Sequence, residues 1–173
     1  IDLLKKLLKY TQTVDEKRAS TDMDTTYEME AFFRDTMQFA RNTEANYSRF
    51  LENLGFLGIH NAYLYLYDNP ISYIQGEIFE IPEYLSLRAV LENGVSLNVP
   101  VNSQKIKKAE VFTNESVKWD SYKRLTMFPI YAENYLYGVV VCDMNRKGFK
   151  DAEMFTNQIS GAIKMLMLRN ENN

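Results

Sequence analysis

The stretch from Leu125 to Asp143 constrains the fold of this chain more than any other part of the sequence. Two runs rich in apolar, β-branched and aromatic residues, Leu125–Tyr131 and Tyr135–Asp143, flank the polar break Ala132-Glu133-Asn134. This pattern predicts a β-hairpin. The second run is almost wholly apolar, so we expect it to form a central strand that is buried on both faces.

Two residues within this hairpin carry further information. Pro129 has no backbone N–H, which predicts that its side of the first strand lies at a sheet edge or a bulge. Gly138 indicates a point where another part of the chain packs close to the backbone. We therefore expect a small sheet built around this hairpin, with helices supplied by the rest of the chain.

Two other parts of the chain predict strands. Asn61–Asp68 alternates between tyrosines on one face and leucines on the other, which is typical of a strand. Leu85–Glu92 ends at Asn93-Gly94, a strong hairpin-turn signal, so Val95–Val101 is expected to pair with it. Between the two strands, Asn69-Pro70 predicts a turn.

The N-terminal part of the chain predicts helices. Ile1–Tyr10 is a short amphipathic segment with leucines on one side and lysines on the other, and Thr11–Ser20 is a polar break. Overlapping capping boxes at Thr21–Thr25 begin a helical region that continues to about Leu57. One long helix fits this region, and so do two helices joined near Arg41–Asn46.

Both the N-terminal helical region and the expected closing helix, Phe149–Asn170, carry two apolar stripes, which is more than one packing surface needs. The first stripes consist of Phe33, Met37, Ala40, Tyr47, Leu51 and Leu54 in the N-terminal region, and Phe155, Ile159, Ala162 and Leu166 in the closing helix. The second stripes consist of Phe32, Phe39, Phe50 and Leu57, and of Met154, Gly161, Met165 and Leu168. We expect one stripe of each helix to cover the sheet and the second to meet another copy of the chain.

The order of these elements predicts an α+β fold, with an antiparallel β-sheet and the N- and C-terminal helices packed on one face. The other face is expected to be covered by Ile71–Pro82, a loop or short strand, and by Ser103–Tyr122, a short helix and loop. We interpret residues 1–20 as an amphipathic linker helix and polar break, and residues 21–173 as a single domain.

Composition narrows the class of protein. Of the 173 residues, 46% are hydrophobic and 25% are charged, the balance of a globular domain. The net charge of −3 argues against a nucleic-acid surface. No run approaches the roughly 18 apolar residues of a membrane span, and the single cysteine fits a reducing, cytoplasmic setting. Because the chain starts at Ile1 and stops within a helical pattern, we expect it to be part of a longer protein.

Three segments resemble one known family in order and spacing. They are Leu57–Asp68 (LGIHNAYLYLYD), Arg124–Asp143 (RLTMFPIYAENYLYGVVVCD) and Phe149–Leu168 (FKDAEMFTNQISGAIKMLML). They are similar to the helix end and first strand, the hairpin, and the closing helix of GAF domains, the small-molecule-binding sensor modules of signalling proteins. The likeness spans about Thr25–Leu168. The chain looks most like the modules that precede bacterial diguanylate cyclase (GGDEF), histidine kinase or AraC-type output domains.

This chain departs from the family at its best-known ligand sites. The Asn-Lys-Phe-Asp-Glu signature of members that bind cyclic nucleotides is absent. Members that bind bilins attach them through a cysteine in a loop, whereas Cys142 lies in a predicted strand. A haem-binding member would need an axial ligand, and the only histidine is His60. The resemblance therefore implies a sensor module and names no ligand.

Residues that could carry chemistry are isolated from one another. We interpret His60 as a helix-to-strand junction residue and Cys142 as a small core residue. Two pairs of aspartates could suggest a metal site. Asp22 and Asp24 are better explained as residues at a helix start, where the helix dipole favours negative charge. Asp120 and Asp143 do not have the spacing of a calcium-binding loop. No nucleophile elbow, P-loop, dinucleotide fingerprint or paired-cysteine zinc pattern is present. We expect no catalytic residues, no metal and no identified cofactor.

Aromatic residues and one arginine are the best candidates for a ligand site. Tyrosines beneath a covering segment can line an apolar pocket, and an arginine within a strand can grip an anionic group. The candidate ligand-binding residues are Tyr63, Tyr65, Arg88, Trp119, Tyr122 and Phe128. The alternative is that the aromatic residues belong to the core and that Arg88 is a solvated charge.

Two functional hypotheses follow. The first is a regulatory sensor module that binds a small molecule between the sheet and Ser103–Tyr122. It relays the ligand state through a homodimer of the terminal helices to an output domain on the same polypeptide. The second is a ligand-free dimerisation or protein-interaction domain of the same fold. An enzyme such as a methionine-sulfoxide reductase would need more reactive cysteines than this chain offers. Neither hypothesis involves nucleic acid or a membrane.

Overall fold

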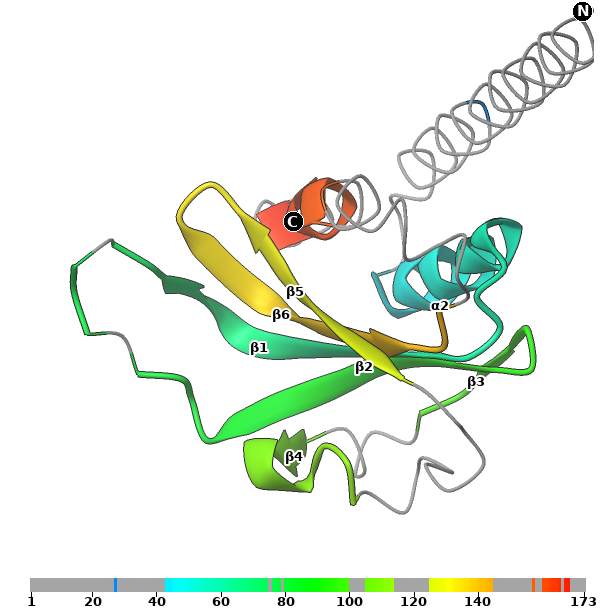
Figure 1. Cartoon of the computed structure of the whole chain (residues 1–173), viewed down its shortest axis with the longest axis horizontal. Helices are drawn as coiled ribbons and strands as arrows, with labels where there is room; N and C mark the ends of the chain where they lie inside the picture. Colours follow the sequence, from blue (N-terminus) through cyan, green and yellow to red (C-terminus); the bar gives the residue numbers. More distant parts are fainter. Residues whose placement is uncertain are drawn as a thin grey trace, which may run out of the picture.

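A computed structural model of the chain describes residues 27, 43–74, 76–78, 80–99, 105–113, 125–144, 157, 160–165 and 167–168. These residues form a six-stranded antiparallel sheet with helices on one face, an α+β arrangement (Figure 1). The strands are β1 (Ala62–Ser72), β2 (Tyr84–Glu92), β3 (Val95–Leu97), β4 (Lys105–Lys107), β5 (Thr126–Ala132) and β6 (Tyr135–Cys142). Among the described helical residues, no helix is both long enough and apolar enough to cross a membrane.

Strand β1 is the centre of the sheet. The strand order is β3-β2-β1-β6-β5, and β4 pairs with β2 at the opposite end of that strand from β3. All of these pairs are antiparallel. Short turns join β2 to β3 and β5 to β6. Strand β1 also pairs with β6, although these two strands lie far apart in the sequence.

The predicted hairpin is confirmed as β5 and β6, joined by a turn at Glu133 and Asn134. Strand β6 lies between β1 and β5, so it is the interior strand that its apolar run predicts. Pro129 lies in β5, which is an edge strand, as its missing N–H requires. A Cβ at Gly138 would overlap the carbonyl oxygen of Tyr65, so the close approach predicted at this glycine is also confirmed.

The turn between β2 and β3 is confirmed as well. Asn93 and Gly94 both have positive φ angles, 51° and 77°, as a type I′ hairpin turn requires. Strand β3 ends at Leu97, earlier than the predicted Val101, and residues 100–104 lie outside the described part.

The predicted turn at Asn69-Pro70 is wrong, because β1 continues through it to Ser72. The pairing with β6 jumps from Leu66 opposite Gly138 to Ile71 opposite Leu136, so residues 67–70 bulge out of the ladder. Pro70 is tolerated in this bulge because a proline cannot donate to a regular ladder. Asn69-Pro70 therefore interrupts the pairing within one long strand and does not reverse the chain.

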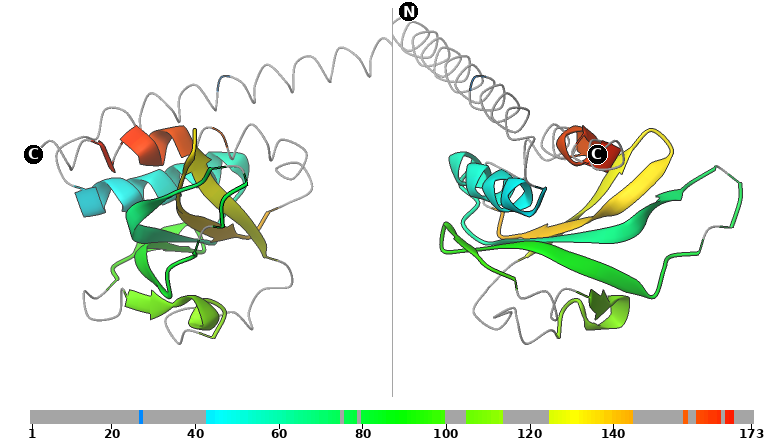
Figure 2. Two further views of the ribbon diagram at one scale, coloured as in Figure 1. Left: turned by 90° about the vertical axis from the view of Figure 1, so that its left-hand side faces the viewer. Right: turned by 180° about the vertical axis from the view of Figure 1, so that it is seen from behind.

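Helices cover one face of the sheet, as predicted (Figure 2). These are α2 (Thr43–Asn53), the 3₁₀ turn η1 (Leu54–Leu57), and the closing helix, whose described residues are 157, 160–165 and 167–168. The helix-side core buries these residues of α2, η1 and the closing helix: Tyr47, Phe50, Leu51, Leu54, Ala162 and Ile163. Phe50, which the pattern assigns to the partner-facing stripe, is only 1% exposed, so that assignment is wrong.

The opposite face is covered only in part as predicted. Ile106 of β4 and Val111, which follows the 3₁₀ turn η3 (Lys108–Glu110), pack on the tyrosines of β1. The described part of Ser103–Tyr122 thus contains the short helical turn η3 together with the strand β4, which was not expected, and residues 114–122 lie outside the described part. Ile71 also packs there, whereas Ile78 is 98% exposed and the described part of the segment after Ile71 extends beyond the end of the sheet (Figure 1).

Other predicted segments lie outside the described residues: 1–20, 21–42 apart from the helical Tyr27, and 114–124. The choice between one long N-terminal helix and two therefore stays open, as does the division of the chain at residue 20.

We predict that Gly138→Ala lowers the free energy of unfolding by about 1–3 kcal/mol, because the new Cβ would overlap the Tyr65 carbonyl and lie 2.8 Å from Leu66 Cα. Urea denaturation followed by circular dichroism measures this change. The matched control is Gly161→Ala in the closing helix, where a Cβ meets no atom within 4 Å. The control should be neutral or stabilise by up to about 1 kcal/mol. Equal stability of the Gly138 variant and the wild type would contradict the observed strand packing.

Candidate functional site

Two of the predicted ligand-binding residues, Tyr63 and Tyr65, lie in the core on the covered face and are fully buried. The Tyr63 hydroxyl lies 3.4 Å from Glu92 Oε1, and the Tyr65 hydroxyl lies 3.5 Å from the carbonyl oxygen of Val111. Burial strongly raises the pKa of Tyr65, so its phenol stays protonated. Their rings therefore contribute to the packed interior, and both hydroxyls have partners within the chain.

Arg88 and Phe128 lie on the other side of the sheet. Phe128 packs against the helix-side core, and the Arg88 charge is close enough to Tyr47 of α2 to offset part of the rise that burial causes in the pKa of Tyr47. A bulge explains the position of Arg88, because Leu64 pairs with Ala89 while the next residue of β1 pairs with Leu87. The structure therefore does not bring these two residues together with Tyr63 and Tyr65.

The remaining two candidates, Trp119 and Tyr122, lie outside the described residues. The same holds for Asp22, Asp24 and Asp120, which were weighed as metal ligands. In the part of the chain that the structure describes, no group of three or more His, Cys, Asp or Glu side chains is arranged to hold a metal ion.

Asp143, which follows β6, is connected to the residues before β1 and, through Asn61, to the turn between β2 and β3. Its Oδ1 accepts hydrogen bonds from the backbone N–H groups of His60 (3.1 Å) and Asn61 (2.8 Å), and its Oδ2 accepts one from Asn61 Nδ2 (2.8 Å). Asn61 Oδ1 in turn accepts from the Asn93 N–H of the β2–β3 turn at 2.9 Å. This network satisfies buried polar groups at the junction. It explains Asp143 as a structural residue and agrees with the interpretation of His60 as a junction residue.

Cys142 is buried in β6 next to this network. Burial, together with the negative charge of Asp143, raises the pKa of the thiol to about 12. Because the thiolate is the nucleophilic form, the side chain is inert at neutral pH. Its position is that of a small core residue.

We predict that Asp143→Ala lowers the free energy of unfolding by about 1–3 kcal/mol, since two backbone N–H groups and the Asn61 amide lose their acceptor. Chemical denaturation measures the loss. The matched control is Asp68→Ala, whose carboxylate is exposed and bonds to Ser86 and Lys105; it should cost less than about 1 kcal/mol. A rise in melting temperature with added divalent cations in the wild type but not in Asp143→Ala would contradict a purely structural role.

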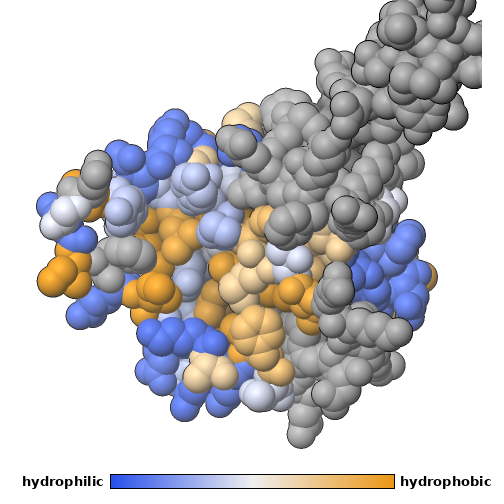
Figure 3. Space-filling model, viewed as in Figure 1, coloured by the Kyte–Doolittle hydropathy of each residue, from blue (hydrophilic) through white to orange (hydrophobic). Residues whose placement is uncertain are grey.

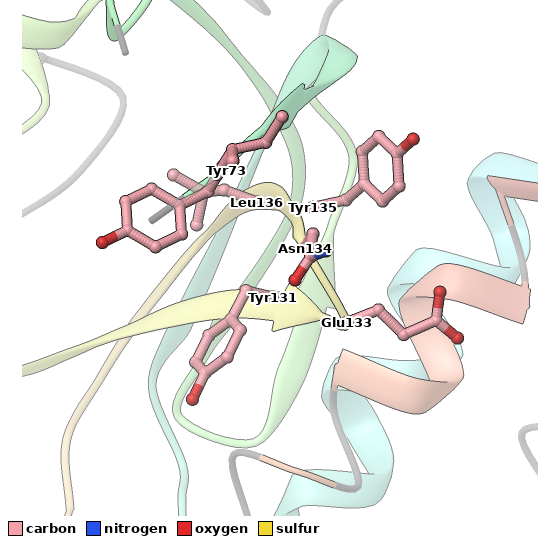
Figure 4. Close-up of a pocket in the computed structure, with 7 residues that line it drawn as sticks. Tyr73, Tyr131, Glu133, Asn134, Tyr135 and Leu136 are labelled. Atoms are coloured by element: carbon pink, nitrogen blue, oxygen red, sulfur yellow. The ribbon is translucent and has the colours of Figure 1, made fainter. Parts of the chain in front are cut away.

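A pocket lies at the tip of the β5–β6 hairpin. Its volume is about 530 Å³. It is lined by Tyr73, Ile74, Tyr131, Glu133, Asn134, Tyr135 and Leu136 (Figure 4). The Tyr73 N–H donates to the Asn134 carbonyl at 2.7 Å and joins the end of β1 to the hairpin turn. We refer to this cavity as the hairpin pocket.

The aromatic rings that line the hairpin pocket lie on two sides of the β5–β6 hairpin. Figure 4 shows the rings of Tyr73 and Tyr131 on one side of the hairpin and the ring of Tyr135 on the other. The pocket is open to solvent, since these three rings are 47%, 53% and 44% exposed. Its lining is mainly aromatic and aliphatic with a few polar atoms, which is typical of small-molecule pockets.

A second, smaller hollow of about 370 Å³ lies between the hairpin tip and the closing helix. It is lined by Pro70, Glu133, Tyr135, Tyr137, Lys164, Met167 and Leu168. Glu133 and Tyr135 thus line both hollows. The Lys164 ammonium lies 2.6 Å from Glu133 Oε1, and this hydrogen bond raises the pKa of Lys164 above its ordinary value.

A second bond also joins the hairpin to the closing helix. The backbone N–H of Tyr131 donates to the hydroxyl of Ser160 at 3.1 Å, and Ser160 is buried. The walls of the hairpin pocket are therefore linked to the closing helix both by a backbone–side-chain hydrogen bond and by the Lys164–Glu133 ion pair.

Sequence reasoning missed the hairpin pocket. It treated Tyr131 and Tyr135 only as strand residues that flank a polar turn, and it placed Tyr73 in a covering loop. An available signal was the pair of tyrosines on either side of Ala132-Glu133-Asn134. Because β5 is an edge strand, its tyrosine has a neighbouring strand, β6, on one side only.

Comparison of the chain with known protein families, with curated proteins and with solved structures gives no match.

Proposed function

We propose that this chain is a regulatory, small-molecule-sensing GAF-like module of a larger bacterial signal-transduction protein, with a diguanylate cyclase or related regulator as its output domain. In this proposal it has no catalytic activity of its own. The proposal is supported by the resemblance of its strand, hairpin and closing-helix sequences to GAF domains. It is also supported by the antiparallel sheet that carries both helices on one face.

The observation that carries the proposal is the shared position of Glu133. This residue lines the hairpin pocket and also binds Lys164 of the closing helix. A ligand that contacts the hairpin turn therefore acts on a residue that also contacts the helix. We assign the small-molecule site to the hairpin pocket, whose volume of about 530 Å³ falls within the roughly 300–1,000 Å³ range of ligand sites.

The proposed mechanism is a shift between two arrangements of the closing helix. A ligand shifts such an equilibrium only if it binds one arrangement more tightly than the other. The Lys164–Glu133 pair and the Ser160 hydroxyl are contacts that can differ between the two arrangements. The helix then carries the change towards the output domain.

We predict that the protein purified from cells shows an extra mass by native mass spectrometry, and that this mass disappears on denaturation. Tyr131→Thr should lower the bound fraction, because losing one aromatic contact costs roughly two- to tenfold in affinity. The control is Tyr84→Thr, which removes a tyrosine of similar exposure, 41%, outside the hairpin pocket. Retention of the extra mass in Tyr131→Thr together with its loss in Tyr84→Thr would contradict the assignment of the ligand to the hairpin pocket.

The homodimer in the proposal uses the second stripe of the closing helix. Met165 and Leu168 belong to that stripe and are 45% and 43% exposed. Their neighbours Ala162 and Ile163 are buried against the sheet. The helix thus uses one side for its own core and presents apolar side chains on another, as a helix at a subunit interface does.

We predict that Met165→Lys combined with Leu168→Lys converts a dimer to a monomer, because charged side chains would be buried at the interface. Size-exclusion chromatography with light scattering measures the mass. The control is Met127→Lys on β5, where an equally exposed methionine, 42%, lies away from the closing helix. A wild-type monomer at high micromolar concentration would contradict the dimer relay.

A ligand-free dimerisation or protein-interaction domain is the alternative function. The full burial of Tyr63 and Tyr65 favours it, since the face predicted to hold a ligand is packed with the chain's own side chains at these two positions. A dimer by light scattering without an extra mass in native spectra would support this alternative over the sensor.

A further inference from the structure

The loop between β1 and β2 exposes an unusual combination of side chains at its outer end. Ile78 is 98% exposed and Ile74 is 52% exposed, and Glu77 and Glu80, which are near them in the sequence, are exposed as well. Figure 3 shows hydrophobic atoms next to hydrophilic ones at this outer end of the molecule. We call the surface formed by Tyr73, Ile74, Glu77, Ile78 and Glu80 the loop-tip surface.

The loop-tip surface contains a turn of defined shape. The Glu77 N–H donates to the Ile74 carbonyl at 3.0 Å, and Gly76 supports the turn with a φ of 92°. Ile78 directly follows this turn in the chain. A nearly fully exposed isoleucine beside other apolar side chains and rimmed by carboxylates is typical of a docking surface.

The electrostatic character of this surface is negative. The sequence has no lysine or arginine between Arg49 and Arg88. Two cations of β4 and η3 have partners elsewhere: Lys108 Nζ donates to the Ile81 carbonyl at 3.1 Å, and Lys105 pairs with Asp68 of β1. An occupant of this surface must therefore offer apolar side chains together with positive charge.

The N-terminal segment of the same chain has this chemistry. Ile1–Tyr10 places Leu4, Leu7 and Leu8 at helical spacing and carries Lys5, Lys6 and Lys9 between them. An amphipathic helix of this kind binds through apolar anchors at i, i+3 and i+4. Its lysines complement Glu77 and Glu80.

The chain is long enough for this contact. Residues 11–42 connect the segment to Thr43 at the start of α2, and these residues span about 48 Å even at the 1.5 Å rise per residue of a helix, more than the roughly 30 Å diameter of a small domain. Attachment to the same polypeptide also gives the segment a high effective concentration at the surface.

We propose that the loop-tip surface is a docking site for Ile1–Tyr10 of the same chain. The leucines cover Ile74 and Ile78, and the lysines pair with Glu77 and Glu80.

Zero-length carbodiimide coupling of the full chain at low ionic strength tests this proposal. Peptide mass spectrometry should find amide bonds that join Lys5, Lys6 or Lys9 to Glu77 or Glu80. Coupling should fall as salt is added, because exposed charges are screened beyond about 10 Å at 0.1 M salt.

Two variants make the test specific. Replacing Leu4, Leu7 and Leu8 by Ser keeps all the charges, so a loss of coupling of about fivefold or more reports the apolar contact. Glu52→Gln removes an exposed carboxylate of α2 instead and should leave the coupling unchanged. Neither variant alters a residue of the described core, so failure to fold does not confuse the result.

Three results would overturn the proposal. One is coupling of the lysines to Glu52 as often as to Glu77 or Glu80, and another is unchanged coupling in the triple serine variant. The third is bonds found only between copies in a mixture of ¹⁴N- and ¹⁵N-labelled protein, which would show a second copy as the occupant. None of these results bears on the native mass spectra, so the proposed binding of a small molecule is tested separately.

Discussion

The pairing of β1 with both β2 and β6 is the constraint on which the rest of the structure depends. Because β1 is the central strand, its first six side chains, Ala62–Tyr67, are buried on both faces of the sheet. Leu64 and Leu66 point into the core beneath the helices, and Tyr63 and Tyr65 point into the core beneath β4. A single alternating strand therefore builds two hydrophobic cores. The absence of a side chain at Gly138 allows β6 to approach it closely.

The interruption in this pairing produces the candidate site. Where residues 67–70 bulge, β1 leaves the regular ladder and then rejoins β6 next to the hairpin turn. This places Tyr73 beside Asn134 and opens the hairpin pocket between the two segments. The closing helix contacts the same turn through Lys164. A local irregularity in a strand thus brings together an open aromatic pocket and the element proposed to report on it.

The parts of the fold that could be predicted depend on neighbouring residues. The β5–β6 hairpin follows from two apolar runs around a short polar break, and the β2–β3 turn follows from Asn93-Gly94, because local backbone preferences decide both. The turn at Asn69-Pro70 was also predicted from local backbone preferences, and this prediction is wrong. There, long-range pairing of Ile71 with β6 keeps the chain extended and overrides the turn preference.

The candidate site could be predicted only in part. The alternation of Asn61–Asp68 correctly places its tyrosines together, but periodicity says nothing about which covering segment meets them. A bulge also changes the face of the sheet on which the following side chains lie. The register shift opposite Leu64 and Tyr65 places Arg88 on a different face from the tyrosines. Exposure of Tyr131 likewise depends on β5 being an edge strand, which is a property of the whole sheet.

The sequence by itself determined the fold class, the hairpins, the edge position of Pro129 and the close contact at Gly138. Each of these follows from local periodicity or from the backbone properties of single residues. Only the tertiary structure decided that β1 lies at the centre, that Phe50 belongs to the core, and that the hairpin turn meets both β1 and the closing helix. The physical reason is that these features arise from contacts between residues far apart in the chain, whose partners and register are chosen by the packing of the complete core.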